Sequence, residues 1–537
     1  MSTASTLPAA RRTNRKRSVR RIAAWLASRA TDPKLSLWLV ISFALVHAVL
    51  WTAILVKLKA AQDVHMDVAE AYAWGQRFLL GYGKHPPLSG WIAGVWFRVF
   101  PVTNWSTYAL AMATVSFALV VCWLIAVRVV DRRRAFFATV MLALYPIFNF
   151  KGFKYNADLA QLIPLPLLVL AYLNAFEKRS VKSGLLLGFA GALALLTKYW
   201  VLTVIGAVGL AALIHPQRLA FLRSPAPWVA IGTMLVVMIP HLVWLEEVNF
   251  VPFTYAGDVY ALSNRALNVQ YVIGYIGHNL ALLAAPVLLG LLALLLGALP
   301  WRPSKARARI WSREPSPAVN PAQALNVWLV QSIVAIGPPL GALAFSIYIK
   351  TDWGIPLFFL VPLALVAIPQ LRVPLTALFA ITAIWLVVTL ATLLAAPSIA
   401  THEMATNHNS ASTYAARSEL ARELTETWQM KFHSRWAVVI ARSDVAEPMT
   451  FYSTDHPAAI MPDEAWSSGL TSLDEARRFG FIGICDTKEP DYATPCQTWM
   501  AEHAKDAEQV VMTTQRFFLG HPGPSTVWKI YFVPPGK

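Results

Sequence analysis

Three acidic side chains stand close together just after the first long apolar segment of the chain. Asp63, Asp67 and Glu70 are separated by four and three residues, so in a helix they would share one face. A carboxylate can accept a proton from a reacting hydroxyl group, and several carboxylates together can bind a divalent cation. The spacing therefore indicates a site for proton transfer or, as an alternative, for a metal ion.

Five lysines fall in segments that the topology described below places on the same side as these acids. The positive-inside rule disfavours lysine in short outer loops, and a bound anion would explain the exception. The alternative is that each lysine is a loop charge in water or reaches a lipid phosphate. The five are Lys84, Lys151, Lys154, Lys198 and Lys350.

The composition identifies the environment in which these residues work. Of the 537 residues, 56% are hydrophobic and 14% are charged, with a mean hydropathy of +0.49, which is typical of a membrane protein. The formal net charge is +17, but the lysines and arginines form short clusters between apolar runs, as membrane topology requires. A nucleic-acid partner is therefore not expected, and membrane lipids are.

The basic clusters also predict the topology. Residues 1–35 form a polybasic arm that should stay in the cytoplasm, and Ser36–Leu58 reads as an uncleaved membrane anchor. Alternation from that point gives about eleven spans up to residue 396, with every basic loop on the cytoplasmic side. The later spans are expected at 105–127, 135–150, 159–176, 185–196, 200–213, 228–245, 271–299, 327–348, 355–368 and 374–396.

Residues 397–537 have an ordinary soluble composition and should lie on the non-cytoplasmic side. An amphipathic stretch at 418–430 and strand-like runs at 436–440, 480–484 and 527–533 predict a small α/β domain. Cys485 and Cys496 enclose a turn-rich stretch, and in an oxidising compartment we expect them to form a disulfide. The predicted fold is thus an α-helical polytopic membrane domain, 36–396, followed by a C-terminal α/β domain.

The outer segments resemble a known family. The run DVAEAYAW at 67–74, with Gly-Tyr at 81–82 and His-Pro-Pro-Leu at 85–88, resembles the first outer loop of GT-C integral-membrane glycosyltransferases. That branch includes the lipid A aminoarabinose transferase, the rhizobial galacturonosyltransferases and the protein O-mannosyltransferases. Residues 155–158, Tyr-Asn-Ala-Asp, are similar to the second-loop acidic motif of the family, and residues 197–199, Thr-Lys-Tyr, are similar to its Thr-Lys turn.

The resemblance implies an inverting transfer of a sugar from a polyprenyl-phosphate donor, at a site on the periplasmic side of the inner membrane. Two departures from the family pattern bear on its residues. Val68 follows Asp67 at a position where the family usually has a second acid, and Glu70, on the same helix face as Asp67, could supply that second carboxylate. His85 precedes Pro-Pro at a position where lysine is common in the family. The residues concerned are Asp67 as the base and Asp158 as a second catalytic acid; Lys84, His85 and Lys198 for the donor phosphate; and Glu70, Tyr72, Tyr82 and Tyr199 for the substrate.

Several alternatives stay open at this level. The acceptor is a hydroxyl group of lipid A, of a polysaccharide or glycan, or of a protein. Asp67 is alternatively a helix cap or a partner for an outer lysine, Asp158 a partner for Lys154, and the aromatic residues membrane anchors. No cofactor is certain, and a divalent metal among the three acids is the remaining option. The competing function is a membrane transporter or a flippase for lipid-linked sugars, which would place charges within the spans and show two similar halves.

Overall fold

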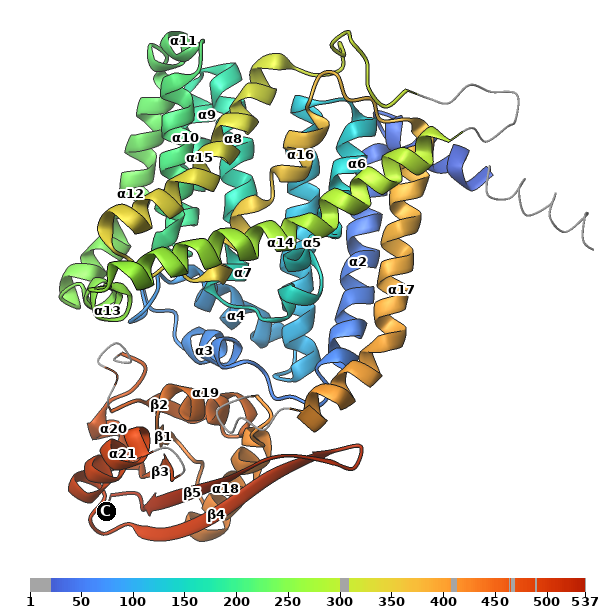
Figure 1. The fold of residues 1–537 in the computed structure, drawn as a ribbon. Coiled ribbons are helices and arrows are strands. Elements are labelled where there is room, and N and C mark those ends of the chain that lie inside the picture. The colour runs from blue at the N-terminus through green and yellow to red at the C-terminus, as the bar shows by residue number, and fades with distance from the viewer. Residues whose placement is uncertain are drawn as a thin grey trace, which may run out of the picture.

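The protein consists of a helical bundle with a smaller domain containing a β-sheet at one end (Figure 1). The structure is a computed structural model and describes residues 21–299, 309–406, 413–462, 464, 469–487 and 490–536. The basic cluster at 11–17 and the basic loop at 302–307 lie outside the described residues.

Seven described helical segments are long and apolar enough to cross a membrane. All seven correspond to expected spans, because runs of about 20 apolar residues can satisfy their backbone groups in lipid only as helices. The segments are α2 (Ser36–Leu58), α5 (Asn104–Val129), α7 with α8 (Ala157–Ala160 and Pro164–Lys178), α12 (Pro225–Glu247), α14 (Arg265–Ala298), α15 (Pro321–Phe345) and α17 (Leu375–Thr406).

The other four expected spans are shorter. Helices α9 (Val181–Leu195) and α10 (Leu202–Ile214) are apolar but below spanning length. The expected span at 135–150 is α6 (Arg132–Ala143) followed by two 3-10 turns, and that at 355–368 is a 3-10 segment followed by α16 (Val361–Val366). The count of about eleven spans therefore stays a prediction.

Helix α14 is the longest element and runs obliquely across the bundle (Figure 1). Its 34 residues correspond to about 50 Å of helix at 1.5 Å per residue, well beyond the roughly 30 Å hydrocarbon core. A helix of that length fits a bilayer only when it is tilted, which agrees with its direction in the bundle.

Short elements lie between the long helices. Helices α3 and α4 lie at the end of the bundle that faces the C-terminal domain (Figure 1). They pack closely, because Gly75 of α3 and Gly94 of α4 meet: a Cβ atom at Gly75 would lie 2.5 Å from the backbone nitrogen of Gly94. The short elements are α3 (Met66–Gly75), α4 (Leu88–Val99), η1 (Pro146–Phe148), η2 (Phe150–Phe153), η3 (Tyr199–Val201), α11 (Arg218–Leu222), α13 (Val251–Tyr260) and η4 (Thr351–Phe358).

The C-terminal domain contains both helices and strands, as expected from its sequence. Its five strands follow the order β2-β1-β3-β5-β4, with β1 parallel to β2 and β3, and β5 antiparallel to β3 and β4. Its core holds the buried side chains of Trp428, Trp436 and Trp528. The elements are α18 (Arg417–Phe432), β1 (Val438–Ile440), α19 (Ser443–Tyr452), β2 (Ala458–Ile460), α20 (Leu473–Phe479), β3 (Phe481–Asp486), α21 (Pro490–His503), β4 (Glu508–Phe518) and β5 (His521–Val533).

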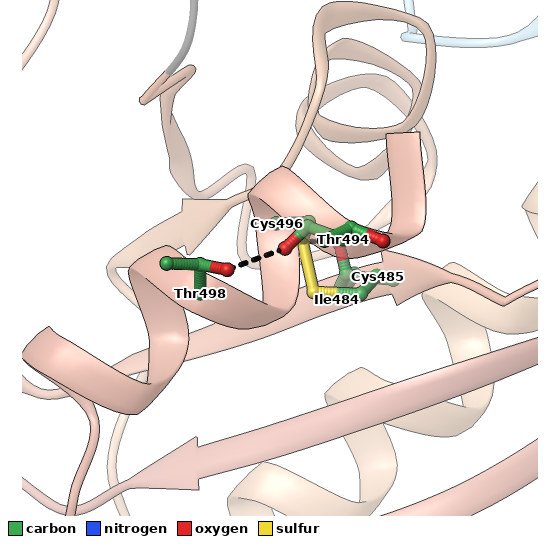
Figure 2. The surroundings of a disulfide bond; sticks show 5 residues. All are labelled: Ile484, Cys485, Thr494, Cys496 and Thr498. Carbon is green, nitrogen blue, oxygen red and sulfur yellow. Dashed lines mark hydrogen bonds between the residues drawn. A yellow bond between two sulfur atoms is a disulfide. The ribbon is translucent and has the colours of Figure 1, made fainter. Parts of the chain in front are cut away.

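The pair of cysteines expected to form a disulfide is joined in the structure. Cys485 at the end of β3 is bonded to Cys496 in α21, with the two Cα atoms 5.7 Å apart (Figure 2). The bond fastens α21 to the sheet. The third cysteine, Cys122, is a buried thiol in α5.

A buried ionic network joins the two parts of the chain. The carboxylate of Asp63, which precedes α3, lies 2.5 Å from a guanidinium nitrogen of Arg516 on β4. It also accepts hydrogen bonds from the backbone N–H groups of Arg417 (2.8 Å) and Ser418 (3.2 Å). Arg516 reaches Glu419 at 2.9 Å as well. Asp63 therefore holds the C-terminal domain in place, and this contact separates it from the other two acids of its group.

Candidate active site

Asp67 lies near the start of α3 and faces groups from the second outer segment. Its Oδ2 accepts a hydrogen bond from Asn156 at 2.9 Å and one from Lys154 at 3.4 Å. Its backbone N–H donates to His65, the N-cap of α3, at 3.2 Å. The first-loop acid and the second-loop motif, 87 residues apart for the lysine, thus meet in one place.

The surroundings of Asp67 decide its protonation. Burial by itself raises the pKa of the Asp67 carboxyl, but His65, Lys154 and the hydrogen bond from Asn156 lower it below its usual range. Asp67 is therefore a carboxylate at neutral pH. About 29% of its side chain is exposed, so a substrate hydroxyl group can approach it.

Glu70, one helical turn further along α3, forms a close ion pair with Lys84. The Lys84 Nζ lies 2.5 Å from Glu70 Oε1, and both side chains are largely buried. Burial lowers the pKa of Lys84, but Glu70 and two acids of the C-terminal domain, Glu447 and Glu464, raise it above its usual value. Lys84 is thus a fixed cation in a position where acids outnumber bases.

Lys198 forms the second close pair, with Asp158. The two atoms Lys198 Nζ and Asp158 Oδ1 are 2.6 Å apart, and only 7% of the lysine side chain is exposed. Asp158 Oδ1 also accepts a hydrogen bond from Gln161 at 3.1 Å. Lys198 lies over the ring of Trp353, 4.9 Å from its centroid. Asp158 therefore pairs with Lys198, while Lys154, the alternative partner, pairs with Asp67.

A cavity of about 400 Å³ brings the predicted phosphate-binding residues together. Lys84, His85 and Lys198 contribute to its wall. The remaining wall is mostly aromatic or apolar and comes from the start of η3, from α13, from the end of α15 and from η4. Those residues include Tyr199, Trp200, Phe253, Tyr255, Tyr260, Phe345, Ile347 and Trp353.

His85 enters the cavity without a charge. Burial, Lys198 and Lys84 lower its pKa well below the ordinary histidine value. It can therefore offer a hydrogen bond to a ligand, but it adds no positive charge at neutral pH. Its backbone closes a turn with Tyr82 through two hydrogen bonds of 2.9 and 3.2 Å, which fixes the loop before Pro86.

The four residues expected to bind substrate divide into two groups. Tyr199 lines the cavity, with its hydroxyl group 3.0 Å from His241 Nε2. Glu70 lies at the site through its pair with Lys84. Tyr72 instead packs edge-on against Phe451 of the C-terminal domain, with ring centroids 5.4 Å apart.

Tyr82 also has a packing position. It stacks on Trp74 at 4.9 Å, and its hydroxyl group donates to the carbonyl groups of Trp74 (2.9 Å) and Arg77 (2.7 Å). Tyr72 and Tyr82 therefore support the loop rather than line the cavity. Both are aromatic residues next to a functional motif, and sequence alone does not distinguish the two roles.

The three acids first considered as metal ligands do not fit a metal ion. Each is paired with a different cation: Asp63 with Arg516, Asp67 with Lys154, and Glu70 with Lys84. In the part of the chain that the structure describes, no group of three or more His, Cys, Asp or Glu residues gathers to hold a metal.

Sequence reasoning missed several residues around this site. Lys350 was noted only as an outer lysine, and it lies over the ring of Tyr260 at 5.2 Å, next to the cavity. Asn156 was part of a quoted motif without a role, and it is a hydrogen-bond donor to Asp67. Glu447 and Glu464 come from the C-terminal domain, and no spacing pattern connects them to the first loop.

The fold is that of the GT-C class of integral-membrane glycosyltransferases. The crystal structure of ArnT from Cupriavidus metallidurans bound to undecaprenyl phosphate matches with a TM-score of 0.53 at 13% identity, over 93% of this chain and 98% of that one. The apo structure of the same protein matches with a TM-score of 0.55, over 91% and 97%. At this identity the likeness concerns the fold.

The sequence comparisons lead to the same class. Residues 84–244 match the model of the dolichyl-phosphate-mannose-protein mannosyltransferase family. The chain is 24% identical over 251 residues to the lipid A galacturonosyltransferase RgtD of Rhizobium johnstonii, which is 44% of this chain and 49% of that protein. It is 23% identical over 330 residues, 60% and 63% of the two chains, to the core galacturonosyltransferase RgtB of the same organism.

The match therefore spans about half to under two thirds of the length of these relatives. The expected resemblance to GT-C membrane glycosyltransferases is confirmed, and the comparisons support an enzyme of that kind.

Proposed function

We propose that this protein is an inverting glycosyltransferase that moves a sugar from a polyprenyl-phosphate donor to a hydroxyl group of lipid A, a polysaccharide or a protein. The observation that carries the proposal is the cavity lined by Lys84, His85 and Lys198, in which His85 lies within electrostatic range of Asp67. Two lysines line it together with aromatic and apolar side chains. An isoprenoid chain suits such walls, and lysine ammonium groups suit a phosphate.

The relatives agree with a donor of this chemistry. One solved structure of the same fold holds undecaprenyl phosphate, and the sequence relatives are named for sugar transfer to lipid A or to the lipopolysaccharide core. A flippase or transporter has no specific support from the site, because the paired acids and lysines of the site collect at one end of the bundle.

The chemistry assigned to each residue follows from its surroundings. The Asp67 carboxylate accepts the proton of the acceptor hydroxyl group as its oxygen attacks the anomeric carbon of the sugar. The bond from that carbon to the phosphate oxygen breaks, and the polyprenyl phosphate leaves with its negative charge opposite Lys84 and Lys198. Attack from the side opposite the phosphate inverts the anomeric centre. No general acid is required, because phosphate is a good leaving group.

The low pKa of Asp67 makes its carboxylate a weak base, which would take the proton of the acceptor hydroxyl group late, after the new bond to the sugar has begun to form. A weak base removes little of the proton before the new bond forms, and it need not do more when the leaving group departs readily. Lys154 and Asn156 keep the carboxylate oriented. Asp158 holds Lys198 in the cavity, so its proposed role is positioning rather than contact with the reacting atoms.

The test is an Asp67→Asn variant, purified and supplied with a polyprenyl-phosphate sugar. The amide keeps the size of the side chain but accepts no proton, so turnover should fall roughly a hundredfold or more, with donor binding retained. Asp258→Asn, an exposed acid on α13, is the control and should leave turnover unchanged. Wild-type turnover in the Asp67→Asn variant would overturn the assignment, and no transfer by the wild type from any such donor would overturn the function.

We also propose that the site faces the periplasm from a bacterial inner membrane. The support is the charge pattern of the loops, since the basic segment at α6 lies at the opposite end of the bundle from α3 (Figure 1). Asp352→Cys and Lys178→Cys variants should react with an impermeant thiol reagent from opposite sides. Labelling of both from the same side would contradict this orientation.

A further inference from the structure

Helix α19 of the C-terminal domain rests directly on the helix that carries Asp67 and Glu70. Phe451 packs on Tyr72 with ring centroids 5.4 Å apart. The Tyr452 hydroxyl group accepts from the Val64 backbone at 2.7 Å and donates to Asn104 at 2.9 Å. The C-terminal domain thus covers the first outer loop with a fixed helix face.

One acid on this helix has a side-chain oxygen that the described part of the chain does not satisfy. Glu447 is 1% exposed, and its Oε2 is buried with no hydrogen-bond partner among the residues that the structure describes. Asp444, one turn earlier on the same helix, contrasts with it: Asp444 is bonded to Arg417 at 2.8 Å and to Arg442 at 2.5 Å. Of the two acids on α19, Asp444 is therefore paired with arginines, and Glu447 keeps one oxygen without a partner in the described part of the chain.

Three of the four charged groups that act electrostatically on Glu447 belong to the proposed active site. The four are Glu70, Lys84 and Asp67 from the first outer loop, together with Glu464 from the segment after β2. Glu464 Oε1 accepts a hydrogen bond from the Ser443 hydroxyl group at 2.9 Å, and its Oε2 is buried with no partner within the described ranges. Burial and Glu70 raise the pKa of the Glu447 carboxyl group well above the ordinary value.

An unsatisfied buried carboxyl group lowers the stability of a protein, and a leucine of similar length would not. A residue that weakens the fold and faces a reaction site is typical of ligand binding. A sugar carries several hydroxyl groups, each of which can both donate and accept a hydrogen bond, so one of them can bond a carboxyl oxygen in either protonation state. This chemistry matches the open group.

We propose that Glu447 is a substrate-binding residue, which bonds a sugar hydroxyl group at the Asp67 site and makes the C-terminal domain part of that site. The inference rests on the proposed glycosyl transfer and deepens it. The hydroxyl group belongs either to the donor sugar or to a glycan acceptor, and the two sources are separated by the kinetics below.

The experiment compares Glu447→Leu and Glu447→Gln in the full-length protein. For each variant, KM is measured separately for the polyprenyl-phosphate sugar and for the acceptor, and Tm is measured in detergent. Glu447→Leu should fold with an equal or higher Tm, while KM for one substrate rises roughly tenfold, the loss of one hydrogen bond. Glu447→Gln, which keeps a donor and an acceptor, should stay within about threefold of the wild type.

Glu426→Leu, an exposed acid on α18, is the matched control and should change neither KM nor Tm. A higher donor KM in Glu447→Leu assigns the contact to the donor sugar, and a higher acceptor KM assigns it to the acceptor. Unchanged KM values for both substrates overturn the proposal. So does a fall in Tm that accounts for the kinetic loss in both variants, because it would make Glu447 a structural acid. A wild type that transfers no sugar refutes the proposed function instead, which keeps the two failures distinct.

Discussion

Replacement of Lys198 by methionine should separate donor binding from folding. Lys198 is one of two lysines in the cavity wall, and its ammonium group lies 2.6 Å from Asp158. Methionine keeps the length and the apolar stem but removes the charge. Two consequences follow, one for the donor phosphate and one for the carboxylate left behind.

The loss of donor binding can be worked out from the charge. A hydrogen bond between charged groups contributes about 2 kcal/mol, which corresponds to about a thirtyfold weaker Kd. For stability, removing one member of a buried ion pair costs about 3 kcal/mol or more. Asp158 is 20% exposed and keeps its bond from Gln161, so we expect about 2 kcal/mol.

A second variant distinguishes the two effects. In Lys198→Met/Asp158→Asn the stranded carboxylate is gone, so most of the lost stability should return while donor binding stays weak. Asp158→Asn alone keeps the Lys198 side chain but removes the carboxylate that positions it, so donor binding should weaken less than in Lys198→Met.

The assay is a direct titration with a polyprenyl-phosphate sugar, together with thermal unfolding in the same detergent. Wild-type Kd in Lys198→Met would refute the assignment of Lys198 to the phosphate. Recovery of donor binding in the double variant would refute it as well, because it would show that the single variant acted through the fold.

Three further predictions concern the pH dependence and the C-terminal domain. The pKa values of Asp67 and His85 both lie below their ordinary ranges. The pH profile of kcat/KM should therefore show no inflection near pH 6.5, the usual histidine pKa, and should fall only in acid, where Asp67 becomes protonated. An inflection near pH 6.5 that the His85→Asn variant abolishes would contradict this prediction. Reduction of the Cys485–Cys496 bond, whose cysteines are 11 residues apart, should lower the unfolding free energy of the C-terminal domain by about 3 kcal/mol. Thermal unfolding of the oxidised protein is compared with that of the reduced protein and of a Cys485→Ser/Cys496→Ser variant, and equal curves for the oxidised protein and the variant would contradict the prediction. Arg516→Met leaves Asp63 buried with backbone donors only and should cost about 3 kcal/mol, seen as faster proteolysis between the domains, whereas Arg422→Met at an exposed pair should change nothing.

The sequence alone predicted the architecture and the segments that form the candidate site. Apolar length and loop charge report directly on the bilayer, so the long helices lie close to where they were expected. Two expected spans are short helices joined to 3-10 segments instead. Those segments contain Pro146 and Pro356, and proline removes a helical hydrogen bond.

The pairing of charges could not be predicted, since it depends on how distant segments meet. Asp67 and Lys154, or Lys198 and Asp158, come together only when the bundle closes. The same holds for Glu447, which lies in a helix whose sequence carries no sign of a membrane partner. Local patterns indicate which residues can do chemistry, and only the packing shows which of them face one another.

The packing of helix α3 between α4 and α19 limits which segments can be exchanged between related proteins. The helix is 10 residues long, its Gly75 touches α4 on one side, and its Tyr72 touches α19 on the other. A chimera that took a foreign C-terminal domain onto this bundle would place an unmatched surface on the helix that carries Asp67. Recombination should therefore succeed only when the first outer loop and the C-terminal domain travel together, although 388 residues separate Val64 from its partner Tyr452. The unit to exchange between related proteins is therefore discontinuous in the gene.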